Sequence, residues 1–164
     1  MRRVMLDSNA LDPLLHTPRA FEAFDQAVKS GQLEILFTHI TVDELAAIPD
    51  LEKRRTLLNL LIALGRLIPT SGAVLDISRL NFYRVMSDDD QTFEPLRSGN
   101  VRHSRDALIA HTALNERCAL VTNEKRLAAR ARELSIEVLT TAELLTEFGV
   151  IPEPPALTTP RGAS

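Results

Sequence analysis

Arg3-Val4-Met5-Leu6-Asp7 is a short apolar run that ends in an acid, and a second apolar run, Ala119-Leu120-Val121-Thr122, shortly precedes Glu124. Runs of this length with large aliphatic residues are typical of buried strands. Stretches with helical periodicity separate the strand-like runs, which favours right-handed crossovers and a mostly parallel sheet. The predicted fold class is therefore α/β, a three-layer α/β/α arrangement with four or five strands.

The other elements are predicted from apolar periodicity and from residues that start or stop helices. Thr17-Pro18 provides an N-cap and a first helical residue, and Gly31 ends this helix. Its predicted apolar stripe consists of Phe21, Phe24 and Val28. Further strands are predicted at 34–38, 73–76 and 137–139, and further helices from 41 to a break at Pro49, at 51–64, 78–86, from 87 onward, and at 105–117, 124–134 and 140–149.

The chain has 164 residues, which is enough for one domain with a buried core. We assign residues 1–149 to this domain. Residues 150–164 are rich in proline and read as an extended C-terminal tail.

Composition excludes several classes of protein. Cys118 is the only cysteine and the four histidines are not closely spaced, so neither a disulfide framework nor a structural zinc site is expected. The apolar stretch Leu60–Leu64 is too short to span a bilayer, and no signal peptide precedes the first strand, so we expect a cytoplasmic protein with no membrane association. A net charge of −3 and few aromatic residues argue against a broadly basic nucleic-acid binder and a base-stacking platform.

Four acids fall where the strand and helix pattern brings them together: Asp7, Glu44, Asp106 and Glu124. Crowded carboxylates repel one another unless a cation, a proton or hydrogen-bond donors hold them, and oxygen ligands suit Mg²⁺ or Mn²⁺ better than zinc. Simpler roles compete with this interpretation. Asp7 can cap a turn, Glu44 can close a capping box with Thr41, and helix dipoles favour Asp106 and Glu124 in first turns.

Four segments, in this order and spacing, resemble the PIN-domain nucleases over about residues 2–148, the family that includes the toxins of VapBC-type toxin–antitoxin pairs. The segments are Val4-Met5-Leu6-Asp7-Ser8-Asn9, Thr41-Val42-Asp43-Glu44-Leu45, Arg105 to Leu114, and Ala119 to Glu124. The resemblance implies a metal-dependent endoribonuclease with RNA as its substrate. It also implies an antitoxin protein as a partner, and we further expect a homodimer.

The resemblance implies that Mg²⁺ or Mn²⁺ is held by Asp7, Glu44, Asp106 and Glu124, with Ser8, Asn9 and Thr122 orienting the ligands or the substrate. Asp7 and Asp106 are the expected direct ligands, and Glu44 is a ligand or a general base. Glu124 departs from the aspartate usual at its place in the family and is expected to complete a weaker site. Arg105, Lys125 and Arg126 are candidates for binding flanking phosphates.

Two other functions compete with the nuclease. The first is a catalytically impaired PIN-fold module that binds RNA or a protein partner, which Glu124 and the tail leave open. The second is an aspartate-based phosphatase with Asp7 as its nucleophile, but Asn9 stands where phosphatases of the haloacid dehalogenase type carry a second acid. No glycine-rich phosphate loop and no Gly-x-Ser-x-Gly motif is found in the sequence.

Overall fold

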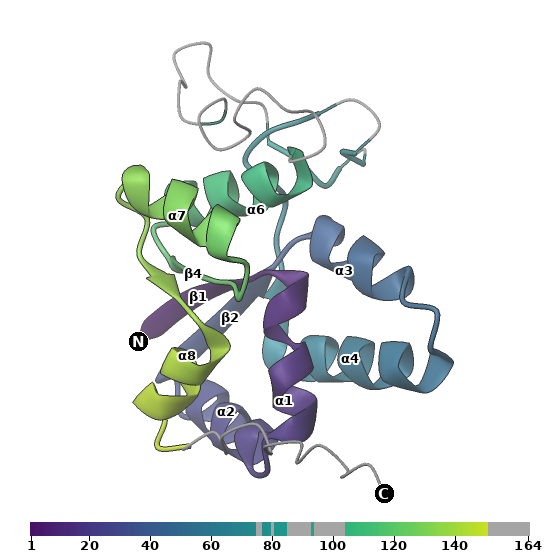
Figure 1. Ribbon diagram of the computed structural model, residues 1–164, viewed down its shortest axis with the longest axis vertical. Helices are drawn as coiled ribbons and strands as arrows, with labels where there is room; N and C mark the ends of the chain where they lie inside the picture. The colour runs from purple at the N-terminus through teal and green to yellow at the C-terminus, as the bar shows by residue number, and fades with distance from the viewer. Residues whose placement is uncertain (75–76, 80, 85–92, 94–103, 151–164) are drawn as a thin grey trace, which may run out of the picture.

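The computed structural model describes residues 1–74, 77–79, 81–84, 93 and 104–150, and at its centre lies a five-stranded parallel sheet (Figure 1). Across the sheet the strands follow the order β3 (Gly65–Leu67), β2 (Leu33–Phe37), β1 (Arg2–Leu6), β4 (Ala119–Val121) and β5 (Val138–Leu139). In the central strand, Val4 pairs with Ile35 on one side and with Ala119 on the other. The predicted α/β class and the predicted parallel sheet are confirmed.

Helices cover both faces of the sheet (Figure 1). One face carries α1 (Asp12–His16), α2 (Ala20–Lys29), α4 (Leu51–Leu64) and α8 (Thr141–Glu147), and the other carries α6 (Ser104–Asn115) and α7 (Lys125–Glu133). A hydrophobic core lies on each face of the sheet, and β1 contributes to both because its side chains point alternately to the two faces. Val4 and Leu6 face one layer of helices, and Met5 faces the other. The helix α3 (His39–Ala46) contributes Ile40 to one core and Leu45 to the other.

Several helix ends lie where the sequence predicts them. Pro49 separates α3 from α4, and the side chain of Asp50 caps α4 by accepting a hydrogen bond from the Lys53 amide at 3.0 Å. Gly31, with φ of 71°, follows the end of α2 in a conformation that few other residues adopt. The last helix begins with a capping box between Thr140 and Glu143.

The predicted start of the second helix is wrong. Thr17 belongs to the end of α1, a short helix that the sequence pattern did not reveal, and its Oγ1 donates to the Pro13 carbonyl at 2.8 Å. The helix α2 begins at Ala20 after Arg19, whose φ is 64°. The buried residues of α2 are Ala20, Phe24 and Ala27, and Phe21 is 43% exposed although it was expected in the apolar stripe.

The predicted capping box at Thr41 and Glu44 is also wrong. The helix α3 begins at His39, so Thr41 lies inside its first turn. The Thr41 hydroxyl donates instead to the Leu6 carbonyl at the end of β1, at 3.2 Å. This leaves the Glu44 carboxylate available for the site described below.

The region after α4 differs most from the sequence prediction. The helix leads directly into β3 at Gly65, whereas Ala73 and Val74 lie outside any strand. Residues 78–79 and 81–84 are not helical, and Tyr83 forms an isolated bridge with Thr70. The helix expected from residue 87 and the tail over 151–164 lie outside the described residues. Within the described part, no helix is long and apolar enough to cross a membrane.

Candidate metal and catalytic site

The four predicted acids come from four elements at the edge of the sheet where its strands end. Asp7 directly follows β1, Glu44 lies on α3, Asp106 lies in the first turn of α6, and Glu124 precedes α7. Their charges act on one another. Glu44 and Glu124 both raise the pKa of Asp7, and Glu124, Asp7 and Glu44 all raise the pKa of Asp106. We call these four residues the acid cluster.

Asp7 is buried, with 2% of its surface exposed, and three donors hold its carboxylate. Oδ1 accepts from the Ser8 amide at 2.8 Å, and Oδ2 accepts from Asn9 Nδ2 at 2.6 Å and from Thr122 Oγ1 at 2.8 Å. Burial raises the pKa of Asp7 to about 6, although the Thr122 and Ser8 bonds oppose this shift. The side chain thus has a fixed orientation together with a strong tendency to bind a proton or a cation.

Asp106 is only partly buried and makes no hydrogen bond with the described residues. Burial and then repulsion from the other three acids raise the pKa of Asp106 to about 7, and attraction to Arg130 partly offsets this. Arg130 is one of the basic residues that follow Glu124 in the sequence, but it was not among the predicted site residues. Nothing in its sequence context separates it from the other arginines of α7, and only the packing of α7 against α6 brings it near Asp106.

Ser8 connects two members of the acid cluster. Its amide donates to Asp7, and its hydroxyl donates to Glu44 Oε2 at 2.6 Å. The Thr41 bond to the end of β1 holds α3 in place for this contact. The structure therefore places Glu44 beside Asp7 through the residue that follows Asp7 in the sequence.

Asn9 and Thr122 both donate to the carboxylate of Asp7. Besides donating to Asp7, Thr122 Oγ1 accepts from the Glu124 amide at 3.1 Å. Asn9 Oδ1 accepts from the Asn123 amide at 2.8 Å. The two polar residues thereby join the ends of β1 and β4, where Asp7 and Glu124 lie.

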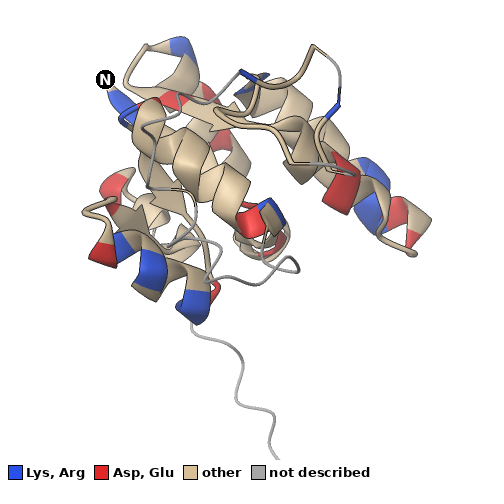
Figure 2. Ribbon diagram, turned by 90° about the horizontal axis from the view of Figure 1, so that it is seen from above, with Lys and Arg blue, Asp and Glu red and all other residues tan. Residues whose placement is uncertain are grey.

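The candidate phosphate-binding residues are placed differently. Arg105, Lys125 and Arg126 are exposed and form neither hydrogen bonds nor ion pairs with any residue that the structure describes. Arg105 precedes Asp106 and Lys125 follows Glu124 in the chain, but neither forms a hydrogen bond or ion pair with the acid cluster. Figure 2 shows basic and acidic residues on several separate elements.

The donor chemistry of the acid cluster fits Mg²⁺ or Mn²⁺. Its oxygen ligands are of the hard type, and the raised pKa values of Asp7 and Asp106 show that a positive charge is favoured there. Among the described residues, no group of three or more acidic, histidine or cysteine side chains is arranged so that it could hold an ion. An ion held by all four acids would require the partly exposed side chains of Glu44, Asp106 and Glu124 to turn toward Asp7.

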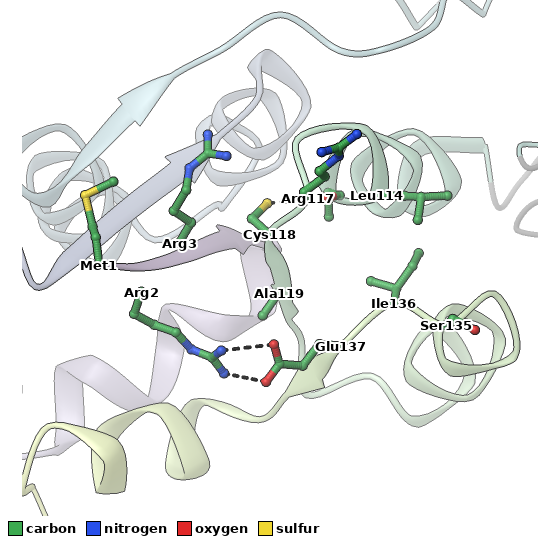
Figure 3. A pocket seen from close by; sticks show the side chains of 11 residues that line it. Met1, Arg2, Arg3, Leu114, Arg117, Cys118, Ala119, Ser135, Ile136 and Glu137 are labelled. Atoms are coloured by element: carbon green, nitrogen blue, oxygen red, sulfur yellow. Dashed lines mark hydrogen bonds and ion pairs between the residues drawn. The ribbon is translucent and has the colours of Figure 1, made fainter.

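A pocket of about 460 Å³ lies at the opposite end of the strands and is separate from the acid cluster (Figure 3). Arg2 contributes to its wall and holds Glu137 through two hydrogen bonds, of 2.9 and 2.7 Å. Cys118 also lines the pocket, and burial raises the pKa of its thiol to about 12. The thiol therefore stays protonated at neutral pH and is a poor nucleophile.

Comparison with known proteins relates the fold, but not the sequence, to characterised ones. No family model matches the chain, and no curated protein matches its sequence. Among solved structures, the PIN-domain endonuclease Utp24 aligns with a TM-score of 0.54 and 15% identity, over 84% of each chain. PAE2754 from Pyrobaculum aerophilum aligns with a TM-score of 0.54 and 18% identity, over 90% of this chain and 97% of that one.

VapBC2 from Rickettsia felis, determined with a DNA fragment from its promoter, gives a TM-score of 0.53 at 17% identity, over 84% of this chain and 98% of the matched one. The TM-scores above 0.5 establish a common fold, and at identities this low they establish the fold alone. The chain therefore has the PIN-domain fold that its four sequence segments predicted.

Proposed function

We propose that the protein is a metal-dependent endoribonuclease that hydrolyses RNA phosphodiester bonds with Mg²⁺ or Mn²⁺. The observation that carries the proposal is the acid cluster itself. Four carboxylates with coupled charges, two of them with strongly raised pKa values, gather where the strands end in a fold shared with a PIN-domain endonuclease. Perturbed carboxylates at this edge of a parallel sheet are characteristic of a reaction site.

Each acid has a role that suits its surroundings. Asp7 and Asp106 hold the metal ion, which supplies charge neutralisation at the phosphate and a more acidic water molecule. Glu44 is fixed through one oxygen by Ser8, so its other oxygen can ligate or accept a proton. Glu124 completes the site with a longer side chain than aspartate. Arg105, Lys125 and Arg126 are free to bind flanking phosphates.

The proposal extends to partners and location. We propose that the protein is the toxin of a toxin–antitoxin pair, is held by an antitoxin protein, forms a homodimer and acts in the cytoplasm. The structural similarity to VapBC2 supports the toxin assignment. Copurification of the protein with the product of an adjacent small gene tests it, and a monomer in sedimentation experiments contradicts the homodimer.

A second candidate is a catalytically impaired PIN-fold module that binds RNA or a protein partner. Two observations favour it. Glu124 replaces the aspartate of the family pattern, and no three acids among the described residues are placed to hold an ion. Such a module would bind RNA with its exposed arginines and leave the bound RNA intact.

Cleavage assays separate these functions. The protein is incubated with single-stranded RNA, structured RNA and a phosphomonoester, each in Mn²⁺ and in excess EDTA. The endoribonuclease cuts RNA internally in Mn²⁺ alone. Asp106→Asn abolishes cleavage, whereas Asp25→Asn, the same change on α2 far from the acid cluster, leaves it intact. Cleavage in EDTA, or a fully active Asp106→Asn variant, refutes the proposal, and RNA binding without cleavage favours the impaired module.

A further inference from the structure

Behind Asp7, a second set of polar contacts joins the ends of β1 and β4 to the start of α8. It consists of Asn9, Asn123 and Thr141, which we call the polar bridge. We propose that Asn123 is a positioning residue that sets the orientation of the Asp7 carboxylate through Asn9. Its effect on catalysis rests on the proposed nuclease function, whereas its effect on Asn9 does not.

The first step is the orientation of the Asn9 amide group. Asn9 Nδ2 donates to Asp7 Oδ2 at 2.6 Å, and Asn9 Oδ1 accepts from the Asn123 amide at 2.8 Å. An amide side chain carries its donor and its acceptor at opposite ends. The backbone N–H of Asn123 therefore selects the Asn9 rotamer that turns the Asn9 NH₂ group toward Asp7. In the reverse rotamer, the Asn9 oxygen would face the carboxylate.

The second step is the position of Asn123 itself. Its Nδ2 donates to the Asn9 carbonyl at 3.1 Å and to Thr141 Oγ1 at 3.0 Å, and its Oδ1 accepts from the Thr141 amide at 3.2 Å. Thr141 is buried, and its hydroxyl donates to the Ala10 carbonyl at 2.8 Å. These bonds fix the backbone of residue 123, and so they fix the amide that it presents to Asn9.

The third step explains why the residue is asparagine. Asn123 is exposed to solvent, so packing does not require a particular side chain there. The bridge needs a donor toward Asn9 and an acceptor toward Thr141 on one short side chain. Aspartate would keep the acceptor but turn an oxygen toward the Asn9 carbonyl, and alanine would provide neither.

The consequence concerns geometry at the reacting end. Three donors hold Asp7, more than any other member of the acid cluster receives from the described residues, and Asn9 supplies one of them. Sites of this kind need their ligands held within about 0.5 Å of the productive geometry. Releasing Asn9 should therefore lower kcat, whereas KM should change little because the bridge lies behind Asp7 and not among the exposed arginines.

The test uses the full chain and the variants Asn123→Ala and Asn123→Asp, with Asn59→Ala on the exposed face of α4 as the matched control. The first readout is hydrogen exchange of the Asn9 side-chain NH₂ in metal-free protein, followed by NMR. Both Asn123 variants should speed this exchange at least tenfold, and Asn59→Ala should leave it unchanged. Unchanged exchange in both variants overturns the proposal, whether or not the wild type cleaves RNA.

The second readout is steady-state cleavage of RNA in Mn²⁺. Both variants should lower kcat at least tenfold with KM within twofold of the wild type and a nearly unchanged melting temperature. Faster exchange throughout the protein, or a large loss of melting temperature, marks Asn123 as merely structural and overturns the proposal. If the wild type itself does not cleave RNA, the nuclease function fails, and the Asn9 exchange still decides whether Asn123 positions Asp7.

Discussion

Asp7 and Asp106 carry the same functional group but are held in opposite ways. Asp7 accepts three hydrogen bonds, whereas Asp106 accepts none from the described residues. The charge of Asp7 is therefore partly compensated, and that of Asp106 is opposed chiefly by burial and by three neighbouring acids. Neutralising Asp106 removes repulsion without breaking a bond, which makes it the cleaner probe of the crowding.

We predict that Asp106→Asn melts at a higher temperature than the wild type in EDTA at neutral pH. After allowance for its partial exposure, relief of repulsion should amount to about 1–2 kcal/mol, or roughly 2–8 °C for a domain of this size. Thermal melts of the two proteins measure the difference. Asp25→Asn should not melt higher, and a destabilised Asp106→Asn variant would show that the acids do not repel one another in the folded state.

Glu44 gives a second prediction at the scale of single residues. Because no capping box forms at Thr41, Glu44→Gln should leave the melting temperature within about 2 °C of the wild type. The Ser8 hydroxyl can still donate to the amide oxygen of glutamine. RNA cleavage should nevertheless fall at least tenfold, because glutamine neither carries a charge nor takes up a proton. Cleavage kinetics and a thermal melt of Glu44→Gln test both expectations. Full activity of this variant would exclude Glu44 from the mechanism.

At the scale of elements, the junction between α4 and β3 depends on close approach. Gly65 ends the helix and begins the strand, and it pairs with Ile35. A Cβ atom there would lie 2.8 Å from Phe37 Cδ1 and 3.1 Å from the Leu61 carbonyl oxygen. Neither neighbour can move freely, because Phe37 is buried in the sheet and Leu61 is part of the helix backbone.

Gly65→Ala should therefore destabilise the protein by about 1–3 kcal/mol, the usual cost of overpacking. Gly149→Ala is a useful comparison, because its Cβ meets nothing within 4 Å and only its φ of 74° is unfavourable. We expect a cost of roughly 1 kcal/mol for that variant. Urea unfolding of both variants measures the two costs, and a Gly65→Ala variant as stable as the wild type would show that the α4–β3 junction tolerates a side chain.

The sequence predicted the buried strands correctly, because burial restricts their residues to apolar types. β1, β2 and β4 are buried on both faces and appear as apolar runs, so their positions were correct within a residue. β3 was missed because it is a three-residue strand at the edge of the sheet and two of its residues, Arg66 and Leu67, are exposed. The starts of α2 and α3 were wrong because Thr17 and Thr41 use their hydroxyls for other bonds than caps.

Prediction of the candidate site also succeeded only in part. Asp7, Asp106 and Glu124 could be selected from the sequence because each stands beside a strand end or a helix start, whereas Glu44 was selected as the opening of a helix that in fact begins at His39. The partners that hold them could not all be found. Ser8 and Glu44 are 36 positions apart, and Asn9 and Asn123 of the polar bridge are 114 positions apart, so these contacts have no local sequence pattern. The metal and the substrate remain predictions.

At the scale of the whole molecule, the acids should make stability depend on pH in an unusual direction. The pKa of Asp7 rises from 3.8 to about 6 and that of Asp106 to about 7, so the folded state binds protons more tightly than the unfolded state. This contribution is fully present below about pH 4 and is lost as the pH rises through 6 to 7. For Asp7 it amounts to at most about 3 kcal/mol.

Other carboxylates act in the opposite direction. Hydrogen bonds from Arg66 and Arg3 lower the pKa of Glu34, and the Thr140 amide lowers that of Glu143, so their contribution is lost as the pH falls below about 4.5. We predict a maximum of stability near pH 5 for the metal-free protein. Urea unfolding between pH 4 and 8 in EDTA checks this, and stability that rises steadily to pH 8 would contradict the raised pKa values.

β1 is the first strand in the chain, yet it occupies the middle of the sheet. During synthesis on the ribosome it can pair with β2 after some forty residues, but its other neighbour, β4, comes only at residue 119. Until then one edge of β1 is open and Asp7 lacks Thr122, Asp106 and Glu124 as neighbours. A nascent chain that stops before residue 119 therefore contains neither β4 nor Glu124, so the acid cluster forms only after these residues have been synthesised.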